Sequence, residues 1–249
     1  MASIYGGGFQ FIMGLDLGQA QDYTALVILE RDELVTPMGA TLDEIDGRVR
    51  HDTRIVDQFL VRHIERFPLG TSYPDIVERV QTILHAAPLT DPIQQVRSVV
   101  VVDRTGLGGP VIDWLAEAGV GPLVGITITA GNEVSQSFEK GYESLTVPKK
   151  ELVSALQLFL QSGRLKIAEE LPDARLLGDE IQAFGVRLSD KTGQESFEPW
   201  RKGAHDDLVL ALALALWYAS RFGTERMLPE LGAKPDHGLP APNELRHPF

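Results

Sequence analysis

The sequence predicts an α/β protein built on a mixed β-sheet flanked by helices, with a β-hairpin before the C-terminal helix. Apolar, β-branched runs at 12–18 and 24–31 are typical of two strands joined by a short loop. The continuous valine run in VRSVVVVD, 96–103, is typical of a strand buried on both faces of an α/β sheet. Segments with helical periodicity follow these strands, which predicts helices packed against the sheet.

The first two strands are joined by GQAQDY, 18–23, a loop able to form a hairpin. Residues 55–61 are predicted to form a third strand, and the polar, glycine-containing segment 31–52 before it is expected to be a loop. A helix is then predicted from Ser72 or Asp75, either of which can cap its N-terminus. Four apolar residues share one face of that helix: Ile76, Val80, Ile83 and Leu84.

Proline and glycine mark the ends of two further helices. GGPVIDWLAEAG has Pro110 near its first turn and Gly119 past its end. VPKKELVSALQLFLQSG has Pro148 and Gly163 in the corresponding places. Another helix is expected over residues 173–183.

The last part of the folded chain is predicted to be a hairpin and a buried helix. DKTGQ, 190–194, separates two alternating runs and is typical of a hairpin turn. HDDLVLALALALWYASR, 205–221, is apolar nearly all round, as in a helix buried on every side. We therefore expect an N-terminal extension at 1–11, one domain at 12–221 and a flexible tail rich in proline and glycine at 222–249.

The composition limits the kinds of site and partner. The chain has 249 residues, 43% of them hydrophobic, and no cysteine, so disulfides, thiolate metal sites and cysteine nucleophiles are excluded. The N-terminus does not resemble a secretion signal, and the longest apolar run, 208–219, is shorter than the roughly 20 residues of a membrane-spanning helix. We expect a cytoplasmic protein with no membrane partner. A formal net charge of −12 argues against a polyanionic partner unless bound cations reverse the local field.

Aspartates lie where ordered elements meet loops. Asp16 ends the first strand, Asp103 ends the valine-rich strand, and Asp206 with Asp207 opens the last helix. In α/β sheets such ends line ligand crevices. If the two strands are neighbours, Asp16 and Asp103 lie side by side, and two carboxylates that close need a proton, a base or a cation. Hard divalent cations with oxygen ligands answer that need.

Each acid also has a purely structural explanation. Asp206 or Asp207 can cap the last helix or interact with its dipole. Asp103 can begin the turn DRTG, Asp16 can end its strand in an Asx turn, and Asp22 can keep the hairpin loop solvated. The functional hypothesis therefore rests on the joint pattern: acids at the first strand, at a later buried strand and at a C-terminal helix.

Three segments, in this order and spacing, resemble the three acidic motifs of the nuclease domain of large terminase subunits from tailed phages: GLDLGQAQDYTALVIL, VVVVDRTGLGGPVIDWL and GAHDDLVLALALALWYA. The segment VPKKELVSALQLFLQSGRLKI is similar to the region that links the second and third motifs in that family. The resemblance covers residues 12 to about 221 and implies a ribonuclease H-like fold.

By this resemblance, the chain is a metal-dependent DNA endonuclease that cuts concatemeric phage DNA during genome packaging with little sequence specificity. Asp16, Asp103 and one or both of Asp206 and Asp207 would ligate two Mg²⁺ or Mn²⁺ ions, and Asp22 matches an auxiliary acid. Two such ions activate the attacking water and stabilise the leaving 3′ oxygen. The implied partners are double-stranded DNA, a packaging ATPase motor, a small terminase subunit and the portal, in the cytoplasm of a bacterial host.

Basic and histidine side chains near the acids have weaker signals. His205 precedes Asp206 and is a candidate ligand or proton carrier, although a lone histidine at a helix start is more often a surface or capping residue. Lys191 on the expected hairpin, with Arg201 and Lys202 close to the third motif, are the best candidates for contacts with the DNA backbone. Single basic residues at such places are usually just solvated.

Two nucleotide-binding patterns are absent from the sequence. There is no Gly-Lys dipeptide, hence no P-loop, so we expect the nuclease part of a terminase without its ATPase motor. DRTGLGG fails the dinucleotide-binding pattern because position 111 is valine. Of the tryptophans, Trp114 and Trp217 fit the core by their helical spacing, and only Trp200 is left open as a residue that stacks on bases.

Other functions remain open at the level of the sequence. A junction resolvase or ribonuclease H on the same fold would cleave branched DNA or RNA·DNA hybrids in preference to duplex DNA. A catalytically silent module, such as a prophage relic, would use its surface to dock on the portal or motor. The DLG at 16–18 suggests a sugar-kinase or actin-like ATPase, but those proteins need two such domains and the chain is too short.

Overall fold

The computed structural model describes residues 9–18, 22–42, 49–86, 88–89, 97–105, 108–188, 195–199, 206–221 and 226–230. The strands are β1 (Phe11–Asp16), β2 (Ala25–Leu42), β3 (Val49–Arg66), β4 (Ser98–Asp103), β5 (Leu123–Thr129), β6 (Ser135–Glu139), β7 (Tyr142–Pro148), β8 (Leu165–Ile167), β9 (Phe184–Leu188), β10 (Glu195–Pro199) and β11 (Arg226–Glu230). The helices are α1 (Tyr73–Leu84), α2 (Gly108–Glu117), α3 (Lys149–Gln161), α4 (Ala174–Ala183) and α5 (Asp207–Ser220).

Within the described residues, one mixed sheet of nine strands organises the fold. Seven strands lie in the order β3-β2-β1-β4-β5-β7-β6, and β8 and β11 both pair with β3. β2 is antiparallel to β1, whereas β4 is parallel to β1. β5 is in turn parallel to β4, and β7 is parallel to β5. The predicted mixed sheet flanked by helices is confirmed, and the strand arrangement is consistent with the ribonuclease H-like fold that the resemblance implies.

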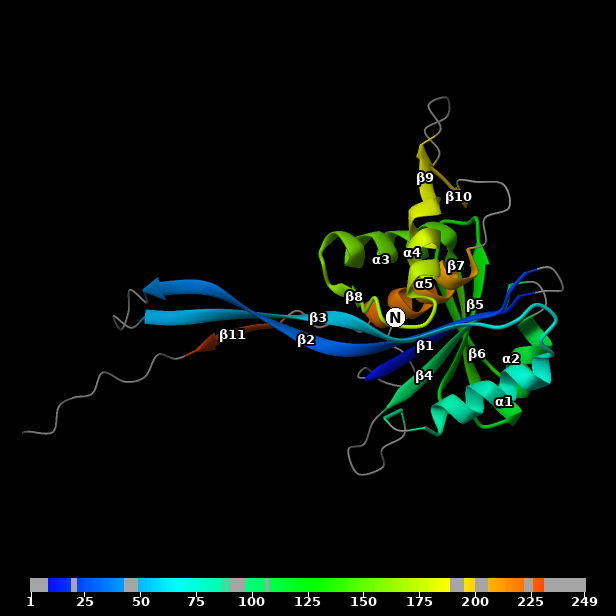
Figure 1. Cartoon of the computed structure of the whole chain (residues 1–249). Coiled ribbons are helices and arrows are strands. Elements are labelled where there is room, and N and C mark those ends of the chain that lie inside the picture. The colour runs from blue at the N-terminus through cyan, green and yellow to red at the C-terminus, as the bar shows by residue number, and fades with distance from the viewer. Residues whose placement is uncertain are drawn as a thin grey trace, which may run out of the picture. The chain divides into compact units, whose positions relative to one another are not determined.

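Helices cover both faces of the sheet: α1 and α2 lie on one face, and α3, α4 and α5 on the other (Figure 1). Strand alternation divides the core accordingly. On β1, Phe11, Met13 and Leu15 pack in the cluster that contains α1 and α2, and Ile12 packs in the cluster that contains α5. Two faces buried in this way explain the continuous apolar character of β1 and β4.

At Gly14, α5 lies so close to β1 that no side chain fits between them. A Cβ atom added to Gly14 would stand 1.9 Å from the backbone oxygen of Ala211. α5 is therefore packed directly on the backbone of β1 at this position. Nearly all of its residues are buried, which explains why it is apolar on all sides. Its C-terminal end is held by Arg31, whose Nη2 donates to the backbone oxygen of Ala219 at 2.8 Å.

Most helices form where the sequence predicts them. Ser72 caps α1 and accepts from the backbone N–H of Asp75, and Pro148 is the N-cap of α3. Gly119 and Gly163 have φ values of +67° and +66°, the left-handed conformation expected after a helix. β9 and β10 form the predicted antiparallel hairpin, while its turn lies outside the described residues.

The expected loop at 31–52 is wrong. β2 continues to Leu42 and β3 begins at Val49, so most of this polar segment is strand. Paired strands satisfy their backbone hydrogen bonds without an apolar face, so side-chain polarity alone did not distinguish this segment from a loop. Four strands, β5, β6, β7 and β8, were not predicted from the sequence, and residues 226–230, within the expected tail, form β11.

The chain divides into two compact units. One comprises Met1–Glu33 with Asp57–Gly223, and the other comprises Leu34–Val56 with Thr224–Phe249. Both clusters of core residues and all described candidate acids belong to the first unit. Among the described residues, no helix has the length and apolar character needed to span a membrane.

Gly14→Ala is expected to destabilise the protein, at the upper end of the roughly 1–3 kcal/mol that overpacking costs, because the new methyl group would meet the backbone of Ala211. Gly178→Ala, inside α4 with nothing near its Cβ position, is the matched control and should stabilise by about 0.5–1 kcal/mol. Urea denaturation of both variants measures the difference. Equal stabilities would contradict the close approach of α5 to β1.

Candidate active site

Asp16 and Asp103 lie side by side on the sheet. β1 and β4 are parallel neighbours in which Leu15 is paired with Val102, so the next residues, the two aspartates, are level with each other. Alternation places Asp16 on the same face as Gly14, the face that α5 covers. Asp16 is buried and Asp103 is half-buried. The two strand-end acids predicted from the sequence therefore come together beneath α5.

Asp206 and Asp207 reach the same region from the first turn of α5. Asp207 is buried, and Asp206 occupies the N-cap position without making a side-chain cap hydrogen bond. The cap is supplied by Glu180 of α4, whose Oε2 accepts from the backbone N–H groups of Leu208 at 2.9 Å and Val209 at 3.1 Å. Those are the two N–H groups that an N-cap side chain ordinarily satisfies. Capping, the structural explanation for Asp206, is therefore performed by another residue.

Asp103 does adopt the turn that the structural explanation proposes. Its Oδ1 accepts from the backbone N–H of Thr105 at 2.7 Å. Burial raises the pKa of Asp103, and the hydrogen bonds from Thr105 act in the opposite direction. The turn and a role in an acidic site are compatible, because one carboxylate oxygen engaged by the backbone leaves the second available for other contacts.

The pKa of Asp16 is affected by burial and by all the other candidate acids. Burial raises its pKa well above the ordinary value, and negative charges on Asp103, Asp207, Asp206 and Asp22 raise it further, in that order. Every acid that the three motifs single out therefore acts on Asp16. Ionising all of them together is unfavourable unless a positive charge is added.

Asp22 lies on an exposed loop that hydrogen bonds hold in place. The backbone N–H of Gly18 donates to Oγ1 of Thr24 at 3.1 Å, and the hydroxyl of Tyr73 donates to the backbone oxygen of Gly18 at 3.2 Å. A Cβ atom on Gly18 would stand 2.2 Å from the backbone oxygen of Asp22, so the backbones of these two residues lie in close contact. Asp22 is thereby kept beside the end of β1.

Arg66 of β3 places a positive charge at the edge of the acids. Its guanidinium contacts Oε1 of Glu180, and its Nη2 lies 3.5 Å from Oδ2 of Asp207. The guanidinium carbon stands 4.7 Å from the centre of the Tyr23 ring, a cation–π contact. The backbone N–H of Arg66 donates to Oδ2 of Asp173 at 3.4 Å. Arg66 therefore links β3 to the first turn of α5.

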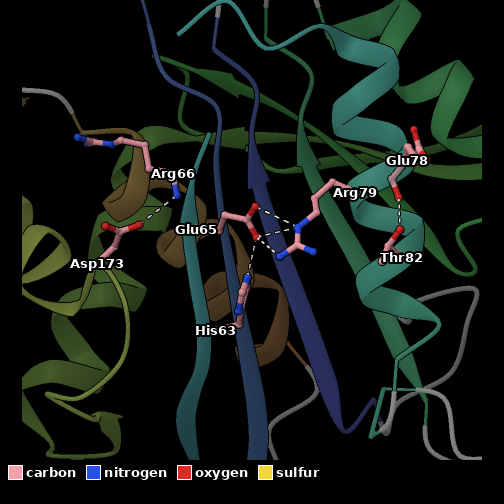
Figure 2. Close-up of polar contacts among 7 residues, drawn as sticks. All are labelled: His63, Glu65, Arg66, Glu78, Arg79, Thr82 and Asp173. Atoms are coloured by element: carbon pink, nitrogen blue, oxygen red, sulfur yellow. Dashed lines mark hydrogen bonds and ion pairs between the residues drawn. The ribbon is translucent and has the colours of Figure 1, made fainter. Parts of the chain in front are cut away.

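Consecutive residues of β3 serve opposite faces of the sheet, as Figure 2 shows for Glu65 and Arg66. Glu65 accepts from Nε of Arg79 at 3.1 Å and from its Nη2 at 3.0 Å, and its Oε2 lies 2.9 Å from Nε2 of His63. These side chains are partly exposed, whereas Arg66 and Glu180 are largely buried. The two ion pairs thus form a natural comparison between a surface pair and a buried one.

Sequence reasoning missed Glu180 and Arg66. Burial raises the pKa of Glu180 to about 7, although its backbone hydrogen bonds and Arg66 act to lower it. A signal was present in the pattern: Glu180 follows Ala174 and Leu177 at intervals of three along the buried side of α4. Arg66 likewise follows the buried Ile64 at the strand interval of two.

The chemistry of these donors fits a divalent cation. The acids supply only oxygen ligands, and a cation would relieve the repulsion that raises the pKa of Asp16. Asp103 follows the β4 residue that pairs with Leu15, and its charge and then that of Asp207 are the two largest electrostatic influences on the pKa of Asp16. In the part of the chain that the structure describes, no three acidic or histidine side chains already stand at ligating geometry. The predicted ligand set therefore stays a prediction.

Several predicted site residues lie outside the described residues: Lys191, Trp200, Arg201, Lys202 and His205. Of the two tryptophans assigned to the core, Trp217 is buried, as predicted. The assignment of Trp114 is wrong, because 43% of its surface is exposed. It lies on α2, whose inner positions are taken by Val111, Ile112 and Leu115, and a tryptophan between them in sequence falls on the outer side.

No protein-family model matches the chain, and no curated protein matches it. Two solved structures of the human cytomegalovirus terminase nuclease domain are similar to it. For the Mn-soaked one, the identity is 14%, the TM-score is 0.43, and the similarity covers 90% of this chain and 93% of that chain. For the other, the identity is 12%, the TM-score is 0.42, and the coverage is 87% and 89%.

Asp16→Asn should stabilise the protein when metal ions are removed with EDTA, because it deletes a buried charge surrounded by other acids. The wild type has a folded-state pKa above that of the unfolded chain, so it loses stability as pH rises above about 4. The advantage of the variant should therefore grow with pH. Thermal melting across a pH series measures it, and an advantage independent of pH would contradict the electrostatic origin.

Glu180→Ala should cost roughly 3 kcal/mol or more, because it uncaps α5 and leaves the buried guanidinium of Arg66 without its main partner. Glu65→Ala, which breaks the surface pair between Glu65 of β3 and Arg79 of α1, should cost no more than about 1 kcal/mol. Urea denaturation gives both values. A cost for Glu180→Ala as small as that for Glu65→Ala would show that α5 does not depend on this cap.

Proposed function

We propose that the protein is a metal-dependent DNA endonuclease that hydrolyses phosphodiester bonds of concatemeric phage DNA during genome packaging, with little sequence specificity. One observation carries the proposal: Asp16 and Asp103 end adjacent parallel strands on the face where α5 begins with Asp206 and Asp207. The elevated pKa of Asp16 supports it, since acids gathered for a structural purpose would not be expected to oppose one another's ionisation.

Each described residue has a defined task in this proposal. Asp16, Asp103 and Asp207 would hold the ions, Mg²⁺ or Mn²⁺, with Asp206 available as a further ligand and Asp22 assisting from its loop. Divalent cations held by these carboxylates would supply an activated water and stabilisation of the leaving oxygen. Glu180 fixes the first turn of α5, and Arg66 orients Asp207. The rigid sheet under Asp16 and Asp103 preorganises the carboxylates.

The DNA contacts and partners are part of the same proposal. The basic side chains Lys191, Arg201 and Lys202 would bind the phosphate backbone near the site. A chain of net charge −12 binds DNA weakly by itself, so a packaging motor that holds the DNA would raise its local concentration at the acids. A small terminase subunit and the portal would complete this assembly, as the resemblance implies.

The wild type should nick and linearise supercoiled plasmid in Mn²⁺ or Mg²⁺ and not in EDTA, and Asp103→Ala should abolish cleavage, because one of two abutting carboxylates is lost. Asp32→Ala, at an exposed aspartate that hydrogen bonds Gln58, is the matched control and should cleave normally. Gel electrophoresis of the plasmid is the measurement.

Two results would contradict the proposed function. Cleavage that persists in a folded Asp103→Ala variant would remove the acidic site from the reaction. A folded wild type that neither cleaves DNA nor releases heat when titrated with Mn²⁺ would favour the silent docking module. Preferential cleavage of branched DNA or of an RNA·DNA hybrid would instead indicate a junction resolvase or ribonuclease H.

A further inference from the structure

A cavity of about 400 Å³ opens beside the acids. Its walls are the loop after β1, the segment that leads into α1, and the outer side of α2. The lining residues that matter here are Gly18, Asp22, Thr71, Tyr73, Pro74 and Trp114. Gly18, two residues beyond Asp16, and Asp22, whose negative charge raises the pKa of Asp16, both line the cavity, so it opens close to the end of β1 that carries Asp16. Its volume falls in the range of about 300–1,000 Å³ that is typical of ligand pockets.

Trp114 is the most unusual residue of this cavity. A tryptophan with 43% of its surface exposed leaves a large flat apolar face in contact with water. Trp114 and Pro74 also border a second hollow of about 300 Å³ along α1, so the indole ring forms a ridge between two depressions. Exposed apolar surface rimmed by polar groups commonly marks a binding site.

The charges around the cavity argue against a phosphate as its occupant. None of the described residues that line it is lysine or arginine, and Asp22 contributes a negative charge. Neutral residues, among them Thr71, Ser72 and Tyr73, make up the rest of the lining. Flat rings with neutral hydrogen-bonding groups suit an aromatic heterocycle, which has a π-face for stacking and an edge of donors and acceptors.

We propose that this cavity binds an unpaired DNA base, stacked on Trp114, next to the phosphodiester that lies at the acids. The proposal rests on the proposed nuclease function and adds a substrate class: DNA with at least one unpaired base beside the cut. A base within a duplex is stacked between its neighbours and cannot reach a side-chain ring. The cavity would therefore favour a frayed, overhanging or locally melted strand over a continuous duplex.

The direct test measures DNA binding in Ca²⁺, a hard cation with oxygen ligands, by fluorescence anisotropy. The probes are a blunt duplex and the same duplex carrying a single-stranded overhang. We expect wild type to bind the overhang more tightly, and Trp114→Ala to lose about tenfold of that affinity, the effect of one stacked base. Trp114→Phe should keep most of it, because phenylalanine also presents a ring.

Phe138→Ala supplies the matched control. Phe138 lies on β6 with 57% of its surface exposed, so it is a comparable exposed aromatic residue that does not line the cavity. Its variant should bind the overhang as wild type does. Equal overhang affinity in Trp114→Ala and wild type, or an equal loss in Phe138→Ala, would overturn the proposal. Tighter binding of an RNA overhang than of the DNA overhang would also overturn it.

A second readout does not depend on the stability of Trp114→Ala. Stacking on a base should quench the tryptophan fluorescence of wild type when the overhang DNA is added, and the quenching should be much smaller in Trp114→Phe. Equal quenching in both proteins would contradict base stacking at Trp114. Plasmid cleavage without a Trp114-dependent overhang preference would overturn only this proposal, whereas Trp114-dependent binding without metal-dependent cleavage would overturn only the nuclease function.

Discussion

The close packing of α5 on the bare backbone of Gly14 is the contact on which the candidate site depends. It fixes the distance between β1 and α5, and those two elements carry Asp16 and Asp207. A side chain at position 14 would push the helix away and separate the acids. The ends of α5 are held by opposite charges, with Glu180 at its first N–H groups and Arg31 at its last carbonyls. Geometry at the site is thus set by packing and capping outside it.

The same arrangement makes the site a source of instability. Asp16 is buried among carboxylates that raise its pKa, and Glu180 is buried close to Asp207. Arg66 offsets part of this cost, because its guanidinium contacts Glu180 and approaches Asp207. Arg66 contacts Asp207 at the first turn of α5 and does not lie between Asp16 and Asp103. Among the described residues, the influences on the pKa of Asp16 are burial and other acids, with no cationic side chain. Folds keep such costs where function requires them.

The sequence predicted the acids and most helices because those signals are local. A valine run ending in Asp103 and an apolar helix opening with Asp206 and Asp207 need no knowledge of distant contacts. Glu180 and Arg66 could not be assigned in the same way, since each acquires its role only when α4, β3 and α5 meet. The full length of strands β2 and β3 was missed because strands were sought as apolar runs, and the outer parts of these two strands are polar. Trp114 was misassigned because its spacing fits a core position, while the face of α2 that meets the sheet is set by tertiary packing.

The acidic character of the chain explains why an exposed tryptophan would be useful for binding DNA. A protein of net charge −12 gains little from general attraction to phosphates, and its candidate site is itself built of acids. Stacking between a ring and a base is insensitive to that charge and works with any sequence, as the proposed nuclease of low specificity would require. Placing such a contact beside Asp22 would hold one strand at the carboxylates without adding positive charges that compete with the metal ions for them. Recognition by a ring and hydrolysis by carboxylates are therefore compatible on one acidic surface.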